Sequence, residues 1–225
     1  MKNSYSNVIN EYVKKMKEEL NENLSMLLII GSSSSDKVME NWSDIDVILV
    51  VKKYNFELIE KIKKIVKVFP IKIGTTIYTE TEFFEKKIDP KTYYHIFLLQ
   101  KGEIELQYKR NGFIIPKITF DEIKQTHTPY LYWRLHTYKR MFLYDELSKE
   151  QYRVLFKTTY LIMKAKLILS GELPKNYDDV FKLYSKKFAI EYFNYEKFIN
   201  DYLKDNKDYE LIYKYAQNFL LSITE

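Results

Sequence analysis

The sequence predicts an α+β unit over residues 1–115, followed by an all-α helical bundle over residues 116–225. Two short, continuous apolar runs of strand length, rich in branched side chains, lie at residues 24–30 and 47–51. Stretches in which apolar side chains recur at helical spacing lie before and after these runs. After Pro116 only helical patterns remain, and we therefore expect the two parts to differ in class.

The first part begins with an amphipathic helix. Residues 7–20 carry apolar side chains at helical spacing, with lysines and glutamates on the other face. The first buried strand then ends at Gly31, and the second strand ends at Val51. The remaining predicted elements are a helix over residues 56–68, a strand over 71–79, helices over 80–87 and 92–100, and a strand over 102–108.

The second part contains recognisable helix starts. Three are predicted, at Thr119 with Glu122, at Thr128 with Pro129, and at Ser148 with Gln151. The helix that begins at Lys149 is expected to end where Gly171 can adopt the left-handed conformation. Further helices are predicted over residues 178–187, 191–203 and 209–223.

The composition excludes several classes of protein. With 46% hydrophobic and 30% charged residues among 225, the chain is expected to be globular. The absence of cysteine excludes disulfides and thiolate metal sites, and it fits a reducing cytoplasmic location. Neither a secretion signal nor a membrane span is expected, because charged residues interrupt every apolar run. The sequence leaves the oligomeric state open, and a dimer is one option.

The net charge of +5 does not indicate a nucleic-acid partner. The basic residues are spread evenly along the chain, and only four of the 36 are arginine. Recognition of phosphates and bases favours arginine, because its planar guanidinium donates two parallel hydrogen bonds.

Two aspartates lie where the second apolar run begins. Side chains at positions i and i+2 of a strand point to the same face, so Asp44 and Asp46 are expected to project together. Two neighbouring carboxylates repel each other unless a cation neutralises them, and a divalent ion that prefers oxygen ligands is the natural partner. The sequence therefore predicts a metal site formed by Asp44 and Asp46.

A glycine and a serine follow the preceding strand. Gly31 permits a tight turn, and exposed backbone N–H groups with the Ser32 hydroxyl can hold phosphate oxygens. A nucleoside triphosphate bound there would reach a metal held by the aspartates. This placement suits an in-line displacement at the α-phosphorus, with pyrophosphate as the leaving group.

The stretch IIGSSSSDKVMENWSDIDVILV resembles the signature of the nucleotidyltransferase superfamily, which includes the kanamycin and other aminoglycoside nucleotidyltransferases. The resemblance implies a mixed sheet flanked by helices and a helical domain after the catalytic one. It implies Asp44 and Asp46 as ligands of magnesium, with one or two ions. It also implies that Gly31, Ser32 and Ser43 surround the phosphates of a nucleoside triphosphate, for which ATP is the first choice.

The sequence departs from this family at the usual third carboxylate. The acid is expected on the strand after the intervening helix, where the sequence offers Gly74 followed by two threonines. Four other glutamates are candidates for this acid, and for each the favoured interpretation is a solvated charge. Glu80 and Glu82 lie just beyond that strand, and Glu103 and Glu105 are expected to share one face of the strand over residues 102–108. The resemblance also implies that a glutamate near the start of a long helix in the helical domain acts as base. Glu150 occupies that position, although a glutamate there also stabilises the helix dipole without any catalytic duty.

The leading hypothesis is therefore a magnesium-dependent nucleotidyltransferase. It would transfer a nucleoside monophosphate to a hydroxyl of a small acceptor such as an aminoglycoside or another antibiotic. Two alternatives stay open. One is nucleotidylation of a protein or a tRNA, as in toxin–antitoxin pairs, and the other is a module that binds nucleotide but has impaired catalysis.

Overall fold

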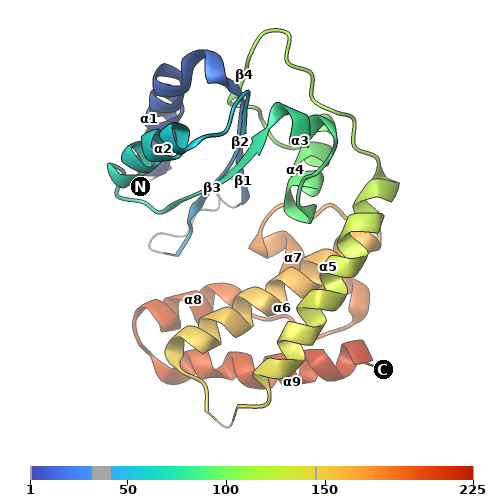
Figure 1. Cartoon of the computed structure of the whole chain (residues 1–225). Coiled ribbons are helices and arrows are strands. Elements are labelled where there is room, and N and C mark those ends of the chain that lie inside the picture. Colours follow the sequence, from blue (N-terminus) through green and yellow to red (C-terminus); the bar gives the residue numbers. More distant parts are fainter. Residues whose placement is uncertain (1, 32–41, 145, 225) are drawn as a thin grey trace. The chain divides into compact units, whose positions relative to one another are not determined.

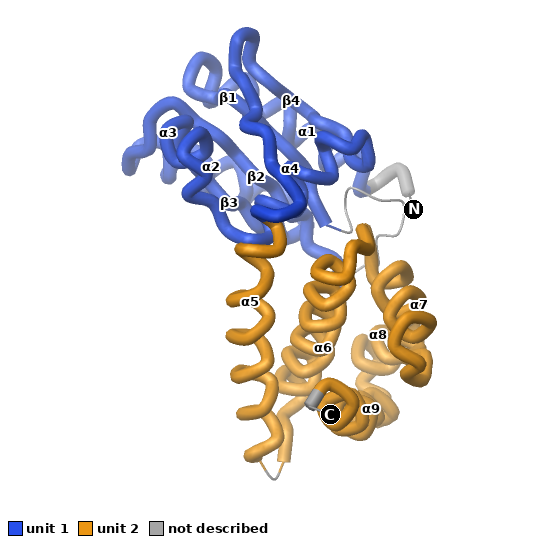
Figure 2. Tube along the Cα trace, turned by 90° about the vertical axis from the view of Figure 1, so that its right-hand side faces the viewer, with its two compact units in different colours: residues 1–122 blue, residues 123–225 orange. Residues whose placement is uncertain are grey.

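A computed structural model describes residues 2–31, 42–144 and 146–224 of the chain (Figure 1). The chain divides into two compact units, Met1–Glu122 and Ile123–Glu225 (Figure 2). The predicted boundary lies between residues 115 and 116, and the boundary between the two units lies seven residues later in the chain. Across the described residues, no helix combines the length and the apolar character needed to cross a membrane.

The first unit is built on a four-stranded mixed sheet with the order β3-β2-β1-β4. Strand β2 is antiparallel to β1 and parallel to β3, and β4 is antiparallel to β1. The mixed sheet predicted for this part of the chain is therefore confirmed. The elements in chain order are α1 (Lys2–Leu20), η1 (Asn21–Asn23), β1 (Leu24–Ile30), β2 (Ile45–Val51), α2 (Phe56–Lys67), β3 (Ile73–Thr79), α3 (Glu80–Phe84), α4 (Pro90–Gln100) and β4 (Tyr108–Lys109).

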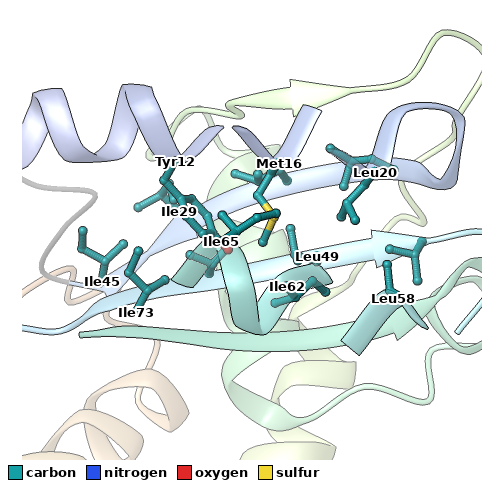
Figure 3. Close-up of a cluster of buried hydrophobic side chains, with 14 residues drawn as sticks. Tyr12, Met16, Leu20, Ile29, Ile45, Leu49, Leu58, Ile62, Ile65 and Ile73 are labelled. Atoms are coloured by element: carbon teal, nitrogen blue, oxygen red, sulfur yellow. The ribbon is translucent and has the colours of Figure 1, made fainter. Parts of the chain in front are cut away.

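The main core of this unit lies between one face of the sheet and the helices α1 and α2 (Figure 3). Alternate residues of β2 from Ile45 to Val51 point into it, and they meet Met16 of α1 and Ile62 of α2. The strand period of two then sends Asp46 to the opposite face, where α3 and α4 lie (Figure 1). The packing of the apolar side thus fixes the direction of the Asp46 side chain, because a register slip would bury the carboxylate in the core.

The prediction of a strand over residues 102–108 is wrong for most of this segment. Only Tyr108 and Lys109 pair with β1, and Gly102 begins the segment at a φ of +72°. The side chain of Gln107 replaces backbone pairing, because its Oε1 accepts the hydrogen bond of the Ile29 N–H at 2.6 Å. An alternating sequence pattern cannot reveal that a side-chain amide takes this role.

The second unit consists of helices, as predicted. These are α5 (Phe120–Met141), which begins in the first unit, and then α6 (Lys149–Leu169), α7 (Tyr177–Phe188), α8 (Tyr195–Leu203) and α9 (Leu211–Thr224), with the 3-10 turn η3 (Lys207–Glu210) before α9. Its core is aromatic: the Phe156 ring of α6 lies 4.4 Å from that of Phe198 in α8 and 5.8 Å from that of Phe181 in α7.

Two of the three predicted helix starts are confirmed. Thr119 and Glu122 exchange capping hydrogen bonds at the start of α5, and Ser148 caps α6 in the same way. The start predicted at Pro129 is wrong, since this residue lies inside α5. Because the capping box at Thr119 already begins the helix, the proline costs one backbone hydrogen bond but does not start a new helix.

Candidate functional site

The candidate site is formed where β1 ends and β2 begins. Ile30, the last residue of β1, pairs with Asp46, and Gly31 follows with a φ of +77°. A Cβ added to Gly31 would lie 3.2 Å from Oδ2 of Asp46. Glycine is therefore favoured at position 31 both by the left-handed backbone and by the carboxylate beside it.

A second glycine lies on the other side of the same carboxylate. Gly74 of β3 pairs with Asp46 in the parallel register, and a Cβ at this position would lie 3.3 Å from Oδ1 of Asp46. The Asp46 side chain thus lies between two positions without side chains. Both distances are shorter than an ordinary van der Waals contact, so the absence of a side chain at each glycine makes room for the carboxylate itself.

Two lysines balance the two aspartates. Nζ of Lys91, in the first turn of α4, lies 2.9 Å from Oδ2 of Asp46, and Nζ of Lys72 lies 3.7 Å from Oδ2 of Asp44. The side chains of Asp44 and Asp46 are 30% and 40% exposed. Ion pairs this exposed exchange partners readily. A cation can therefore take the place of the lysines beside the carboxylates, and a phosphate can take the place of the carboxylates beside the lysines.

The chain just before the aspartates is buried. Trp42 and Ser43 are 3% and 8% exposed, and the Ser43 carbonyl oxygen accepts a hydrogen bond from the Tyr5 hydroxyl at 3.3 Å. This contact ties the approach to β2 to the first helix. Ser32, the remaining predicted nucleotide-binding residue, lies outside the described residues, as do the three serines that follow it.

No family model and no curated protein matches this sequence. Among solved structures, one similar chain is spectinomycin adenyltransferase AAD(9) from Enterococcus faecialis, crystallised with ATP and spectinomycin. The TM-score is 0.57 at 15% sequence identity, and the match covers 96% of this chain and 98% of the other. The chain has a nucleotidyltransferase-like fold. The match extends over nearly all of both chains, so it includes the helical unit as well as the sheet.

The two aspartates of the candidate site offer oxygen donors, which are the ligands that magnesium prefers. Within the described ranges, no group of three or more histidine, cysteine, aspartate or glutamate side chains is placed to hold a metal ion. Magnesium commonly binds to one or two protein carboxylates while phosphate and water oxygens complete its shell. Asp44 and Asp46, whose side chains are 30% and 40% exposed, fit that kind of site rather than a closed protein cage.

The four glutamates that are candidates for a third carboxylate lie elsewhere in the first unit. Glu80 follows the far end of β3, where its Oε1 accepts hydrogen bonds from Ser25 and, at 2.6 Å, from Arg110. Glu82 caps α3 by bonding the Thr79 N–H at 2.8 Å. Both acids therefore have structural partners, several residues along β3 from Gly74.

Glu103 and Glu105 belong to a different feature. They precede β4 in an irregular segment, and the expectation that they share one face of a strand is wrong. Together with Ile29 and Gln107 they line a cavity of about 340 Å³. This cavity lies beside the edge of β1, on the side of the sheet that faces α1.

Glu150 lies in the second unit, at the second position of α6. Its Oε2 accepts a hydrogen bond from the Tyr202 hydroxyl at 2.9 Å, and its Oε1 lies 3.7 Å from Nη1 of Arg153. Its side chain is 65% exposed. The structure thus brings Gly31, Asp46 and Gly74 together in the first unit, and it holds Glu150 among partners of the second.

Sequence reasoning missed the two lysines of the site. Lys72 directly precedes β3, and Lys91 follows the Asp89–Pro90 start of α4. The available signal for Lys91 was its location, because a cation in the first turn of a helix is disfavoured by the helix dipole and calls for a compensating anion.

Proposed function

We propose that this protein is a magnesium-dependent nucleotidyltransferase. It transfers the nucleoside monophosphate of a nucleoside triphosphate, ATP in the first instance, to a hydroxyl group of a small acceptor, and it releases pyrophosphate. The observation that carries the proposal is the Asp46 carboxylate, which lies between Gly31 and Gly74 at the junction of three strands. The similarity in fold to an adenyltransferase whose crystal structure contains ATP and spectinomycin supports the proposal.

In this proposal the turn after β1 receives the phosphates. Gly31 allows backbone N–H groups to face the ligand, and Ser32 and Ser43 flank it. Asp44 and Asp46 hold the magnesium, which when bound neutralises charge at the phosphates and orients the leaving group. The sheet contributes the fixed direction of the Asp46 carboxylate, so little reorganisation is needed when the nucleotide binds.

The acceptor side is assigned to the helical unit, and a small hydroxylated molecule such as an aminoglycoside is the first candidate. Gly74 supplies no carboxylate, so the base that removes the acceptor proton has to come from another residue. Glu150 is the candidate, because it lies near the start of a long helix of this unit and its side chain is 65% exposed, so an acceptor hydroxyl can reach it. The absence of cysteine fits a cytoplasmic site of action.

The position of Gly74 also favours a second candidate function. A chain that retains the nucleotide turn and the metal carboxylates but lacks the acid on β3 has what is needed to bind a nucleotide without transferring it. In that case the protein acts as a nucleotide-binding module.

The deciding experiment incubates the purified chain with α-labelled nucleoside triphosphates, magnesium and a panel of acceptors. Label should appear on a small hydroxylated molecule, and Asp46→Asn should abolish it, whereas Asp121→Asn, an exposed aspartate at the start of α5, should not. Label on protein or tRNA would redirect the proposal to those acceptors. Calorimetric nucleotide binding without any transfer would establish the binding module, and the absence of both would remove the proposal.

A further inference from the structure

Lys91 contacts the oxygen of Asp46 that faces the nucleotide turn. Its Nζ lies 2.9 Å from Oδ2, the same oxygen that lies 3.2 Å from a Cβ built on Gly31. The other carboxylate oxygen, Oδ1, faces Gly74. The two oxygens therefore differ: Oδ2 carries an ammonium group beside the proposed phosphate turn, and Oδ1 lies beside the glycine of β3.

The backbone that carries Lys91 is held firmly in place. Asp89 caps α4 by accepting the Thr92 N–H at 2.9 Å, and it also accepts a hydrogen bond from the hydroxyl of Tyr78 on β3. Nδ1 of His95 lies 2.6 Å from the Lys91 carbonyl oxygen. The start of α4 is thus tied to the strand that carries Gly74, and the lysine is directed at the site from a fixed base.

The location of Lys91 is unfavourable for a lysine with no role. The first turn of a helix exposes unpaired N–H groups and the positive end of the dipole, so a cation there is disfavoured. Its side chain is 50% exposed and would be solvated equally well in many other directions. A residue that opposes the local preference and points at a candidate active site is more simply explained by function than by helix stability.

The carboxylates of the site are few. Two aspartates are present, and Gly74, whose Cβ position lies 3.3 Å from Oδ1 of Asp46, adds no further carboxylate with which to hold a second divalent ion. A lysine ammonium offers three N–H donors and one positive charge to phosphate oxygens, and lysine binds phosphate in this way in many nucleotide sites.

We propose that Lys91 binds the phosphates of the nucleotide and provides the positive charge that a second divalent cation would otherwise provide, so that the site holds a single divalent cation. This inference rests on the proposed function, because it needs a nucleotide at the Gly31 turn. Lys91 leaves Asp46 when the metal occupies the carboxylates, and its half-exposed side chain is free to turn to the phosphates.

The test counts metal ions on the full chain, with manganese(II) and an ATP analogue that has a methylene group between its α- and β-phosphorus. Electron paramagnetic resonance measures the bound manganese, and calorimetry measures the dissociation constant of the nucleotide. We expect one manganese per nucleotide on the unaltered protein. Lys91→Gln should raise the nucleotide dissociation constant about tenfold, the scale of one lost charge-assisted contact. Lys87→Gln should change it by less than about twofold, because Lys87 is 70% exposed and pairs with Glu85.

The outcomes separate the two proposals. Two manganese ions per nucleotide on the unaltered protein, or equal dissociation constants for the two variants, would overturn the role of Lys91 and leave the nucleotidyltransferase proposal standing. No nucleotide binding by the unaltered protein would overturn both. If Lys91→Gln does not fold, as judged by circular dichroism, the metal count on the unaltered protein still tests the proposal, because two manganese ions per nucleotide would overturn it.

Discussion

A methyl group on Gly74 would lie 3.3 Å from Oδ1 of Asp46, because the parallel register of β2 and β3 places these two residues side by side. The carboxylate on β2 and the missing side chain on β3 therefore form one feature of the site. Any larger residue at position 74 must share space with Asp46, and a charged one must also share its electrostatic environment.

Gly74→Asp should destabilise the metal-free protein more than Gly74→Ala does. Both variants add a Cβ against Asp46, but only the aspartate adds a like charge, which we expect to cost about 1–2 kcal/mol of unfolding free energy. Urea denaturation measures the difference, and added manganese should reduce it because the metal neutralises the pair. A difference that manganese does not change would contradict a metal at this carboxylate.

Gly31→Ala should cost more stability than Gly112→Ala. The two glycines have nearly the same φ, +77° and +76°, so the backbone penalty of about 1 kcal/mol is common to both. A Cβ at position 112 has no neighbour within 4 Å, whereas one at position 31 meets Asp46. Urea denaturation measures the loss of unfolding free energy in each variant, and the larger loss in Gly31→Ala is due to that contact. Equal losses would show that the Asp46 side chain moves aside freely.

Glu150→Gln should reduce nucleotidyl transfer about 100-fold or more if this carboxylate acts as the base, with little change in nucleotide affinity. Glu196→Gln is the matched control, since Glu196 also lies in the first turn of a helix and accepts a tyrosine hydroxyl, that of Tyr195, at 3.1 Å. Steady-state kinetics with a transferred label distinguishes them. Similar rates for both variants would assign Glu150 to helix stability alone.

Tyr138→Phe should destabilise the second unit by about 1–3 kcal/mol, the usual cost of leaving buried polar groups without partners. The Tyr138 hydroxyl is buried, donates to the Ala216 carbonyl oxygen at 3.0 Å and lies 3.0 Å from the Thr159 hydroxyl. Tyr132→Phe, at a position 62% exposed, should have almost no effect. Thermal unfolding of the two variants gives the comparison, and equal midpoints would show that water satisfies these groups.

Glu122→Gln should reduce the amount of unfolding free energy that the protein loses as the pH falls. The hydrogen bond from Lys86 is the main cause that lowers the pKa of Glu122 below its usual 4.5. A carboxyl group with a lowered folded-state pKa stabilises the protein above the pKa of the unfolded chain, and this stabilisation disappears as the pH falls through the folded-state value. Glutamine keeps the Thr119 capping box but not the charge, so urea midpoints between about pH 6 and pH 3 should change less in the variant. An unchanged profile would assign the acid sensitivity to other carboxylates.

The sequence predicted those parts of the fold that depend on neighbouring residues. Continuous apolar runs identify β1 and β2, and Ser148 with Gln151 identifies the start of α6, since each signal lies within one element. The prediction of a strand over residues 102–108 was wrong because this segment is held by the side chain of Gln107, whose partner Ile29 lies 78 residues earlier in the chain. Local patterns carry no information about such a distant contact.

The site was predicted in part for the same reason. The Asp44 and Asp46 pair and the Gly31 turn are short motifs, so the sequence displays them directly. The sequence also shows that no acid stands at position 74, but only the strand register shows that Gly74 adjoins Asp46. The helix dipole marks Lys91 as unusual only once the start of α4 is known, and the approach of this lysine to Asp46 depends on that start and on its anchor at Tyr78.

The mixed order of the sheet has a consequence for how the protein folds. Strands β1 and β2 are successive and antiparallel, whereas β2 and β3 are parallel and joined by a crossover through α2. A hairpin closes early because its strands are close in sequence, and a crossover pairs later because a longer chain segment must first be ordered. Asp46 should therefore meet Gly31 before it meets Gly74, and a nascent chain would have one side of the candidate site in place before the sheet is complete.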